Sequence, residues 1–527
     1  MKKILKIFLL LVIGISIVGC KKENDNHEKV LDPIDDNYRV FYEIFTGSFS
    51  DSDGDGIGDL QGIINRFDYL NDGDINSGNS LGIQGIWLTP IFESPSYHKY
   101  DVQDYYKIDP DFGTMDDLKE LIELAHSRNV LVIIDLPINH TSSANDWFLD
   151  FKIAHQNGKT TSEYYDFYSW CTRETKPSNR TFNSIQGCND LYEANFTGDM
   201  PELNFDNVKV RNECLNIAKF YLDMGIDGFR FDAAKYIYYS EEEKSVAFWD
   251  WYMAELRKIK EDIYCVGEVW SNDLETIAYN TSLNCFNFSM SGTTGYIYNA
   301  ASLGDANVYT NYVVRYINQI HEKNKDAIFM PFISNHDMDR ASGFLTVATK
   351  RAFMAANLYI LCYGSPFIYY GEEIGMKGSR GGAMTDANRR LAMLWGDGDT
   401  VEDPIGTTYD KDKQTNGTVK ELLNGDDNIL KYYMKLIAFR NKYPAIGRGE
   451  YSAITLSGTK VGAYKIIYNN EEYYLLHNTL NGSSEIALSK LSSDELVLLD
   501  FIGQESSKVE NNTLTIGGQS SVLLKKK

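Results

Sequence analysis

Three carboxylate side chains stand directly after short apolar runs that lie far apart in the chain. Asp232 follows GIDGFRF, Glu268 follows IYCVG and Asp337 follows IFMPFISNH. A single carboxylate in such a place more often caps a helix or a turn, but three of them after three apolar runs indicate a catalytic site. A protonated carboxyl group paired with an ionised one can act as a general acid beside a base or nucleophile.

Two histidines and an arginine accompany these carboxylates. His140 follows VLVIIDLPIN, and His336 directly precedes Asp337. Arg230 lies two residues before Asp232. Because alternate residues of a strand point to the same side, the guanidinium of Arg230 should lie beside the Asp232 carboxylate and favour its ionised form.

The elements that must position these groups are eight apolar runs, which alternate with amphipathic helical stretches from residue 38 onward. This alternation is typical of parallel strands joined by crossover helices, and eight such strands close a (β/α)8 TIM barrel. The strand carboxyl ends of a barrel converge on one mouth, where all six groups above then fall. The expected strands are 40–44, 83–88, 130–136, 228–231, 263–267, 285–288, 328–333 and 366–370.

The barrel pattern is interrupted once and then ends. After the third strand comes a stretch of Ser, Asn, Thr, Tyr and Gly that is too long for a structureless loop, which predicts a small insertion domain. Beyond residue 446 the helical period is lost, and Asn469-Asn470 between two alternating runs predicts a hairpin of an antiparallel β-sandwich. The expected domains are 38–140 and 207–446 for the barrel, 141–206 for the insertion and 447–527 for the β-sandwich.

Four segments resemble, in order, the best-known regions of the α-amylase family of glycoside hydrolases, family 13. They are DLPINH at 135–140, GFRFDAAKY at 228–236, GEVW at 267–270 and FISNHD at 332–337. MPELN and SPFIYYGEEIGM resemble two further motifs of this family. The resemblance covers about residues 38–527. It implies hydrolysis of α-1,4-glucosidic bonds in starch, maltodextrins and other α-glucans through a covalent glycosyl-enzyme, with retention of configuration.

The same resemblance implies a role for each site residue. Asp232 is expected to be the nucleophile, Glu268 the general acid/base and Asp337 the stabiliser of the transition state. Retention requires the nucleophile and the acid to lie about 5–5.5 Å apart. The residues expected to bind substrate are Tyr100, His140, Arg230, Lys235, His336, Asp386 and Arg390.

A metal site is predicted by DSDGDGIGD, in which closely spaced carboxylates would repel one another without a cation. Hard oxygen ligands suit Ca²⁺, and Gly62 in place of a glutamate excludes an EF-hand. The resemblance implies one Ca²⁺ in this loop, since Tyr236 departs from the histidine of a second family site. An Asp/Gly-rich turn without an ion is the alternative. The expected ligands are Asp51, Asp53, Asp55, Asp59 and the carbonyl of Ile57.

Two features bear on linkage specificity and on competing functions. DAAK, with Lys235, resembles α-1,4-acting amylases and maltodextrinases, whereas oligo-1,6-glucosidases typically carry Val after the nucleophile. MPELN is intermediate between neopullulanase-like and oligo-1,6-glucosidase-like forms. An endo-type α-amylase is therefore expected, with a maltodextrinase, neopullulanase or oligo-1,6-glucosidase on short oligosaccharides as the alternative. A non-catalytic surface protein that only binds glucan should have lost a carboxylate, and none is missing.

The first residues predict secretion and a lipid anchor. A basic start, an apolar run and a small-residue end in residues 1–20 are typical of a signal peptide. The ending IVGC resembles the lipobox of bacterial lipoproteins, which implies acylation of Cys20. Residues 21–37 are then expected to form a polar tether, and the protein is expected to be extracytoplasmic and lipid-anchored at the bacterial cell surface or membrane.

Charge and cysteine content limit partners and cross-links. The net charge of −23 argues against binding to nucleic acid, whose phosphates would be repelled. We expect a monomer. Six cysteines follow Cys20, and an even number outside the cytoplasm permits disulfides. Cys171 and Cys188 lie in a loop-rich stretch, where both a disulfide and two free thiols stay open.

Overall fold

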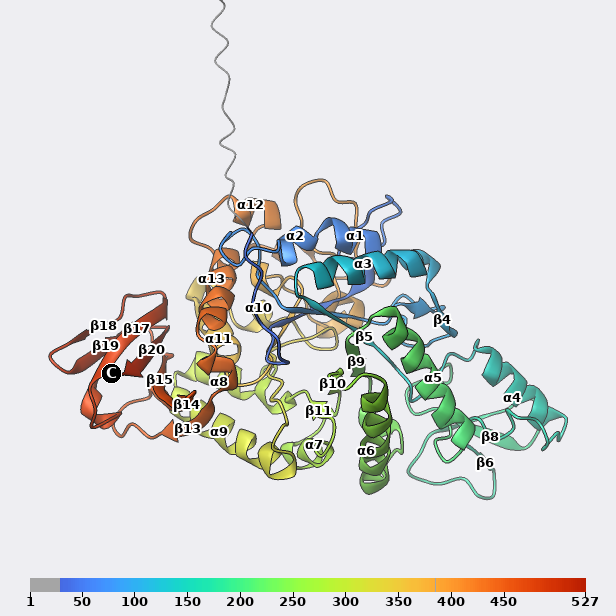
Figure 1. Ribbon diagram of the computed structural model, residues 1–527. Coiled ribbons are helices and arrows are strands. Elements are labelled where there is room, and N and C mark those ends of the chain that lie inside the picture. The colour runs from blue at the N-terminus through green and yellow to red at the C-terminus, as the bar shows by residue number, and fades with distance from the viewer. Residues whose placement is uncertain (1–28, 384) are drawn as a thin grey trace, which may run out of the picture.

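The computed structural model describes residues 29–383 and 385–527 of the chain (Figure 1). Its centre is a 7-stranded parallel sheet in the order β11-β10-β9-β5-β2-β1-β12. Seven of the expected barrel strands are therefore confirmed. They are β1 (Phe41–Ile44), β2 (Gly85–Leu88), β5 (Leu131–Asp135), β9 (Gly228–Phe231), β10 (Tyr264–Gly267), β11 (Asn284–Cys285) and β12 (Phe367–Tyr369).

The eighth expected strand, at 328–333, is not regular. It makes one isolated parallel bridge, from Met330 to Phe286, on its β11 side. On its other side the N–H of Phe367 donates to the carbonyl of Pro331 at 3.0 Å. Because proline has no N–H, this segment cannot complete a ladder of hydrogen bonds. The segment nevertheless lies between β11 and β12 and closes the sheet into a (β/α)8 barrel, as expected.

The helices that cover the barrel follow the expected alternation. The helix expected at 115–128 is α3 (Met115–Ser127), which begins with a capping box between Thr114 and Asp117. α5 (Val208–Met224) ends at Gly225, whose backbone is in the left-handed conformation. The other helices of the barrel part are α1 (Leu60–Asn65), α2 (Phe67–Leu70), α6 (Glu242–Ile259), α7 (Asp273–Tyr279), α8 (Tyr296–Leu303), α9 (Ala306–Lys323), α10 (Ala341–Phe344), α11 (Arg351–Ile360), α12 (Val419–Leu423), α13 (Ile429–Lys442) and α14 (Ala445–Arg448).

Inside the barrel, apolar side chains form a floor beneath the mouth. Phe41, Trp87 and Ile133 belong to this inner cluster, whereas Tyr42 of the same first strand belongs to the outer core between strands and helices. Successive residues of a strand point to opposite faces, which explains the division. This apolar floor excludes water from the space beneath the polar side chains at the carboxyl ends of the strands.

The insertion after β5 contains α4 (Asp146–Gln156) and a three-stranded antiparallel sheet of β6 (Trp170–Thr172), β7 (Phe182–Ser184) and β8 (Asp190–Glu193). His155 of α4 binds Asp190 of β8 through Nδ1 at 2.8 Å. A short pair, β3 (Phe92–Glu93) and β4 (Asp104–Ile108), precedes the insertion. In Figure 1 the insertion and the C-terminal strands lie on opposite sides of the barrel.

The C-terminal part consists of a 5-stranded and a 3-stranded antiparallel sheet that share one apolar core. The hairpin at Asn469 and Asn470 is confirmed, since both residues have positive φ angles of 50° and 64°, as a tight hairpin turn requires. The strands are β13 (Glu450–Ile454), β14 (Gly462–Tyr468), β15 (Glu471–Asn478), β16 (Ser484–Ala487), β17 (Leu496–Gly503), β18 (Lys508–Glu510), β19 (Thr513–Ile516) and β20 (Ser520–Lys526).

The structure does not contain the disulfide considered for Cys171 and Cys188. All six cysteines within the described residues are free thiols. Cys171 lies inside β6 opposite Leu191, while the thiol of Cys188 donates to the carbonyl of Ile185 at 3.8 Å. The two side chains therefore have separate surroundings.

The predicted signal peptide, Cys20 and the start of the tether lie outside the described residues. Among residues 29–383 and 385–527, no helix has both the length and the apolar character that crossing a membrane requires.

Candidate active site

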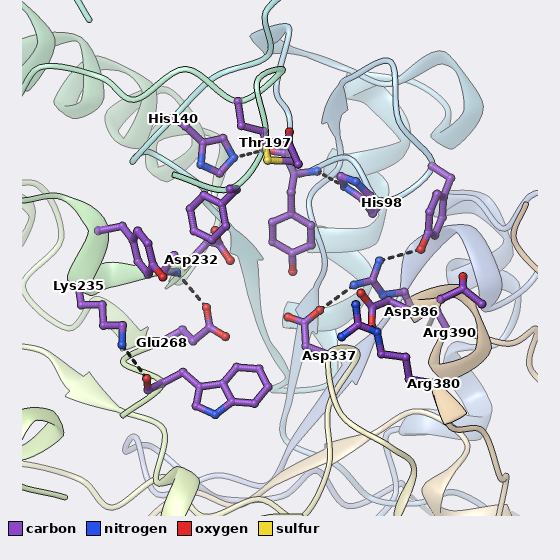
Figure 2. Close-up of a pocket in the computed structure, with 18 residues that line it drawn as sticks. His98, His140, Thr197, Asp232, Lys235, Glu268, Asp337, Arg380, Asp386 and Arg390 are labelled. Carbon is purple, nitrogen blue, oxygen red and sulfur yellow. Dashed lines mark hydrogen bonds and ion pairs between the residues drawn. The ribbon is translucent and has the colours of Figure 1, made fainter. Parts of the chain in front are cut away.

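A cavity of about 800 Å³ lies at the mouth of the barrel (Figure 2). The three carboxylates that the sequence singled out come together there. Figure 2 shows the Glu268 carboxylate facing Asp337 across the cavity, with Asp232 close to Glu268. The expected site residues that line the cavity are Tyr100, His140, Asp232, Lys235, Glu268, Asp337, Asp386 and Arg390.

Arg230 connects the two carboxylates on one side of the cavity. Its Nη1 lies 2.7 Å from Oδ1 of Asp232, and its Nη2 lies 3.0 Å from Oε2 of Glu268. Nη1 also contacts Oδ1 of Asp135 at 2.8 Å. The expected contact between Arg230 and Asp232 is confirmed, and a single buried guanidinium holds both carboxyl groups at the base of the cavity.

Burial sets the protonation of these carboxyl groups. It raises the pKa of Glu268 and of Asp232, and the charge of Arg230 opposes it at both. Burial likewise raises the pKa of Asp135 to about 7. The raised pKa of Glu268 suits a group that must donate a proton. Arg230 thus limits, but does not cancel, the cost of ionising Asp232.

Asp337 has the opposite surroundings. Its Oδ1 lies 2.7 Å from Nη2 of Arg390, and its Oδ2 lies 3.0 Å from Nε2 of His336. Burial would raise the pKa of Asp337, but the charges of His336 and Arg390 outweigh burial and hold that pKa well below its usual range. Asp337 is therefore an anion across the cavity from Glu268.

His336 lies behind the cavity wall, between two carboxylates. Its Nδ1 is 2.6 Å from Oε1 of Glu43 in β1, a residue that the sequence did not single out. Burial lowers the pKa of His336, but the charges of Asp337 and Glu43 outweigh burial and raise it to about 10. His336 is consequently an imidazolium at neutral pH.

Tyr100 and His140 form the wall next to Asp232 and Glu268. The Tyr100 hydroxyl donates to Oδ2 of Asp135 at 2.8 Å, and its ring stacks on that of His336 with centroids 5.4 Å apart. His140 contacts the Tyr100 carbonyl through Nε2 at 3.2 Å. Burial lowers the pKa of His140 to about 4, so this imidazole is neutral and presents one N–H.

The two ends of the cavity differ in chemistry. At one end, Lys235 donates to the carbonyl of Trp270 at 2.9 Å, and the indole of Trp270 is 46% exposed. Phe196 from the insertion, 43% exposed, also lines this cavity. At the other end Asp386 accepts from Nη1 of Arg389 at 2.8 Å, near Arg390 (Figure 2). Aromatic faces suit sugar rings, and charged groups suit sugar hydroxyls.

Some of these residues were not predicted from the sequence. Trp270 directly follows Glu268 and Val269, so the GEVW segment contained a signal for it. Tyr97, whose hydroxyl contacts Nη1 of Arg390 at 3.0 Å, lies only three residues before the expected Tyr100. Phe196 lies in the insertion, where nothing in the sequence distinguishes it from other aromatic residues.

The acidic loop after β1 brings three of its four aspartates together. One ligand oxygen from each of Asp51, Asp53 and Asp59 lies within 4.8 Å of the others. Asp55 instead accepts from the N–H of Ile57 at 2.7 Å and is not part of this group. Burial raises the pKa of Asp59, which means that its ionised form is costly as the loop stands. All the ligand atoms of this group are oxygens, and a hard divalent cation would offset the cost of ionising Asp59.

Comparison with known proteins agrees with this geometry. Residues 43–449 match the family model "Alpha amylase, catalytic domain". Alpha-amylase 3 of Dictyoglomus thermophilum is 35% identical, covering 92% of this chain and 93% of that protein. An oligo-1,6-glucosidase of Bacillus cereus is 28% identical over 90% and 96% of the two chains. A 4-alpha-glucanotransferase of Thermotoga neapolitana is 28% identical over 84% and 96%.

Solved structures show the same likeness across nearly the whole chain. Amy13B of Eubacterium rectale superposes with a TM-score of 0.86 at 32% identity, covering 95% of this chain and 97% of that one. The alpha-amylase from H. orenii superposes with a TM-score of 0.81 at 35% identity, covering 94% and 100%. The match to the family model, the barrel and these relatives together show that the chain belongs to the α-amylase family of glycoside hydrolases.

Proposed function

We propose that this chain is an endo-type α-amylase that hydrolyses α-1,4-glucosidic bonds of starch and malto-oligosaccharides with retention of configuration. The observation that supports this most directly is the bridge of Arg230 between Asp232 and Glu268. Two carboxyl groups held by the two terminal nitrogens of one guanidinium are close enough to act on a single anomeric carbon from opposite sides.

In the first half of the reaction, Glu268 donates its proton to the glycosidic oxygen while Asp232 attacks the anomeric carbon. The bond between that carbon and the oxygen breaks, the leaving sugar departs with the proton, and the remaining sugar is bound covalently to Asp232. In the second half, Glu268 takes a proton from water, and the water oxygen displaces Asp232. Both carboxyl groups return to their starting states.

Asp337 supports both halves without forming a bond. It is an anion opposite Glu268, and the positive charge that develops on the sugar in each transition state is attracted to it. His140 lines the cavity with a neutral imidazole that is bound to the Tyr100 carbonyl, and Tyr100 offers a ring on which the sugar can stack. Lys235 with Trp270, and Asp386 with Arg390, are suited to bind the sugars on either side of the cleaved bond.

Relatives with other activities define the second candidate. The names of two relatives, an oligo-1,6-glucosidase and a 4-alpha-glucanotransferase, correspond to cleavage of α-1,6 bonds and to transfer onto a sugar acceptor. Both outcomes use the same covalent intermediate. Product profiles on amylose, pullulan, panose and maltotriose separate them. Mixed maltodextrins from amylose support the α-amylase, and panose cleavage without amylose cleavage supports the α-1,6 alternative. Products longer than maltotriose formed from maltotriose support transfer.

The nucleophile is tested by Asp232→Asn together with covalent trapping. We expect this variant to lose starch hydrolysis by roughly four orders of magnitude while its melting temperature stays near that of the wild type. Asp223→Asn, at an exposed helix position, is the matched control and should keep full activity. A fluorinated maltosyl substrate should label Asp232 in the wild type. Turnover by Asp232→Asn near that of wild type, or a label on Glu268, would refute these roles.

We further propose that the acidic loop binds one Ca²⁺. Asp51, Asp53 and Asp59 would supply the first ligands, and a bound cation would offset the repulsion among them. Asp55 and the carbonyl of Ile57 remain candidate ligands that would require a small rearrangement of the loop. The ion would stabilise the segment that follows β1.

The lipid anchor at Cys20 also remains a proposal. It rests on the basic, apolar and small-residue order of residues 1–20 and on the IVGC ending. Expression in a bacterium with labelled fatty acid tests it. Label in the wild-type chain but not in Cys20→Ser supports acylation, and an unlabelled membrane-free wild type contradicts it.

A further inference from the structure

Glu43 is a buried carboxylate at the active site for which the mechanism above has no role. It is 2% exposed and lies in β1, at the level of Trp87 in β2 and Tyr369 in β12. Its Oε1 accepts from His336 twice, from the ring at Nδ1 (2.6 Å) and from the backbone N–H (3.3 Å). The first barrel strand therefore holds a histidine that lies 293 residues further along the chain.

Both nitrogens of the His336 ring face carboxylate oxygens. Nδ1 faces Glu43 at 2.6 Å, and Nε2 faces Oδ2 of Asp337 at 3.0 Å. A neutral imidazole has only one N–H, so one of these two contacts would place a lone pair against a carboxylate. The doubly protonated ring satisfies both contacts. The arrangement is thus a chain of carboxylate, imidazolium and carboxylate that ends at the cavity.

The position of Glu43 also fixes the direction of the other ring nitrogen. With Nδ1 bound to Glu43, Nε2 makes a hydrogen bond with the Tyr100 hydroxyl at 2.7 Å and lies 3.0 Å from Oδ2 of Asp337. Asp337 and Tyr100 both line the cavity, whereas Glu43 does not. The hydrogen bonds of Glu43 go to His336, so we expect its effect on substrate to pass through that residue.

The charges around His336 explain why it needs Glu43 as a second carboxylate partner besides Asp337. When a sugar fills the cavity it displaces water, and the loss of water disfavours the charged form of a buried histidine. The charged side chains that face Glu43 are His336 and Arg230, and its strand neighbours Trp87 and Tyr369 carry no charge at neutral pH. Burial raises the pKa of Glu43, and the charges of His336 and Arg230 oppose this effect. An ionised Glu43 therefore offers His336 a counter-charge on the side away from substrate.

We propose that Glu43 is a positioning residue, which holds His336 as an imidazolium with its Nε2 against Asp337 and Tyr100, the two residues that carry its effect to the cavity. This inference rests on the proposed function, because it assigns His336 and Asp337 to the transition state of glycoside cleavage. Glu43 itself touches neither substrate nor the reacting atoms.

The first test measures the protonation of His336 directly. The wild type is labelled with ¹⁵N-histidine, and His336→Asn assigns the His336 signals among the eight histidines. At pH 8 the wild type should show an imidazolium at His336, and Glu43→Gln should shift its titration down by at least about one pH unit. A neutral His336 in the wild type at pH 8 would overturn the proposal, even if Glu43→Gln fails to fold.

The second test asks whether Glu43 acts through His336. We expect Glu43→Gln to lower kcat roughly tenfold or more with a much smaller change in KM, since the contact serves the transition state. In a His336→Asn background the same substitution should have little further effect, because the partner is already gone. An equal loss in both backgrounds would contradict action through His336.

Glu373→Gln is the matched control. Glu373 is also fully buried and accepts from two tyrosine hydroxyls, those of Tyr42 and Tyr69, but it does not line the cavity or contact His336. The Glu373→Gln variant should change the free energy of unfolding without changing the pH at which His336 titrates. If the wild type hydrolyses no α-glucan, the proposed function fails, while the titration still decides whether Glu43 controls His336.

Discussion

The backbone N–H of Ala233 donates to Oε2 of Glu268 at 3.0 Å. Ala233 directly follows Asp232 and has a φ of 42°, in the left-handed region that residues other than glycine rarely adopt. The turn after β9 therefore carries Asp232, the expected nucleophile, and also holds Glu268, the expected acid, which directly follows β10. Strained backbone of this kind persists where the surrounding structure requires it, which is often at a functional site.

Replacing Ala233 with glycine tests this strain. Because glycine adopts positive φ without a steric cost, we expect Ala233→Gly to leave the free energy of unfolding unchanged or to raise it by up to about 1 kcal/mol. Ala234→Gly, at the next and fully buried position, is the matched control. This substitution should lower the free energy of unfolding by about 1 kcal/mol. Urea denaturation measures both. Equal destabilisation by the two variants would show that the φ of Ala233 carries no strain.

Arg230→Lys tests the bridge between the carboxyl groups. The variant keeps the charge, but an ammonium cannot meet three carboxyl groups as a planar guanidinium does. We expect kcat to fall about a hundredfold, with lower stability that partly recovers at acidic pH as the unpaired carboxyl groups take up protons. Arg448→Lys, at an ion pair with Asp36 outside the cavity, should keep kcat. Wild-type kcat in Arg230→Lys would contradict the proposed role of the bridge.

The pKa of His336 predicts how stability depends on pH. Its folded value of about 10 lies above its ordinary value of 6.5, so its ion pairs stabilise the fold fully below pH 6.5, and this stabilisation is lost as pH rises through 10. Above pH 6.5 the difference in free energy of unfolding between wild type and His336→Gln should therefore shrink, by at most about 1.4 kcal/mol per pH unit. At acidic pH the difference also includes the titration of Asp337 and Glu43, whose pKa values depend on His336. A difference that stays constant from pH 6 to pH 10 would contradict an imidazolium at this position.

Removal of Ca²⁺ tests the acidic loop. A chelator should lower the melting temperature of the wild type, and added Ca²⁺ should restore it, because a ligand that binds only the folded state stabilises that state. Asp51→Asn should lower the melting temperature and remove most of the response to the chelator, whereas Asp223→Asn should respond like the wild type. An unchanged melting temperature after chelation, with no ion in native mass spectrometry, would leave the loop as a turn without a metal.

Much of the fold was predictable because its signals are local. Runs of apolar residues identified seven of the barrel strands, and Asn469-Asn470 identified a hairpin, since each depends on a few neighbouring residues. The segment at 328–333 was expected to be a full strand, but Pro331 limits its pairing to one bridge. The disulfide considered between Cys171 and Cys188 could not be decided from spacing, because it depends on where a whole insertion places two thiols.

The sequence by itself determined which groups meet at the proposed active site, because polar residues that end apolar runs gather at the mouth of a parallel barrel. Asp232, Glu268 and Asp337 were all identified in this way. Only the tertiary structure revealed the partners that set their charge, Glu43 above all. Both faces of a barrel strand are buried, so FYEI shows no alternation from which the inward direction of Glu43 could be inferred. Its contact with His336 exists only because barrel closure brings the first strand beside a segment 293 residues away.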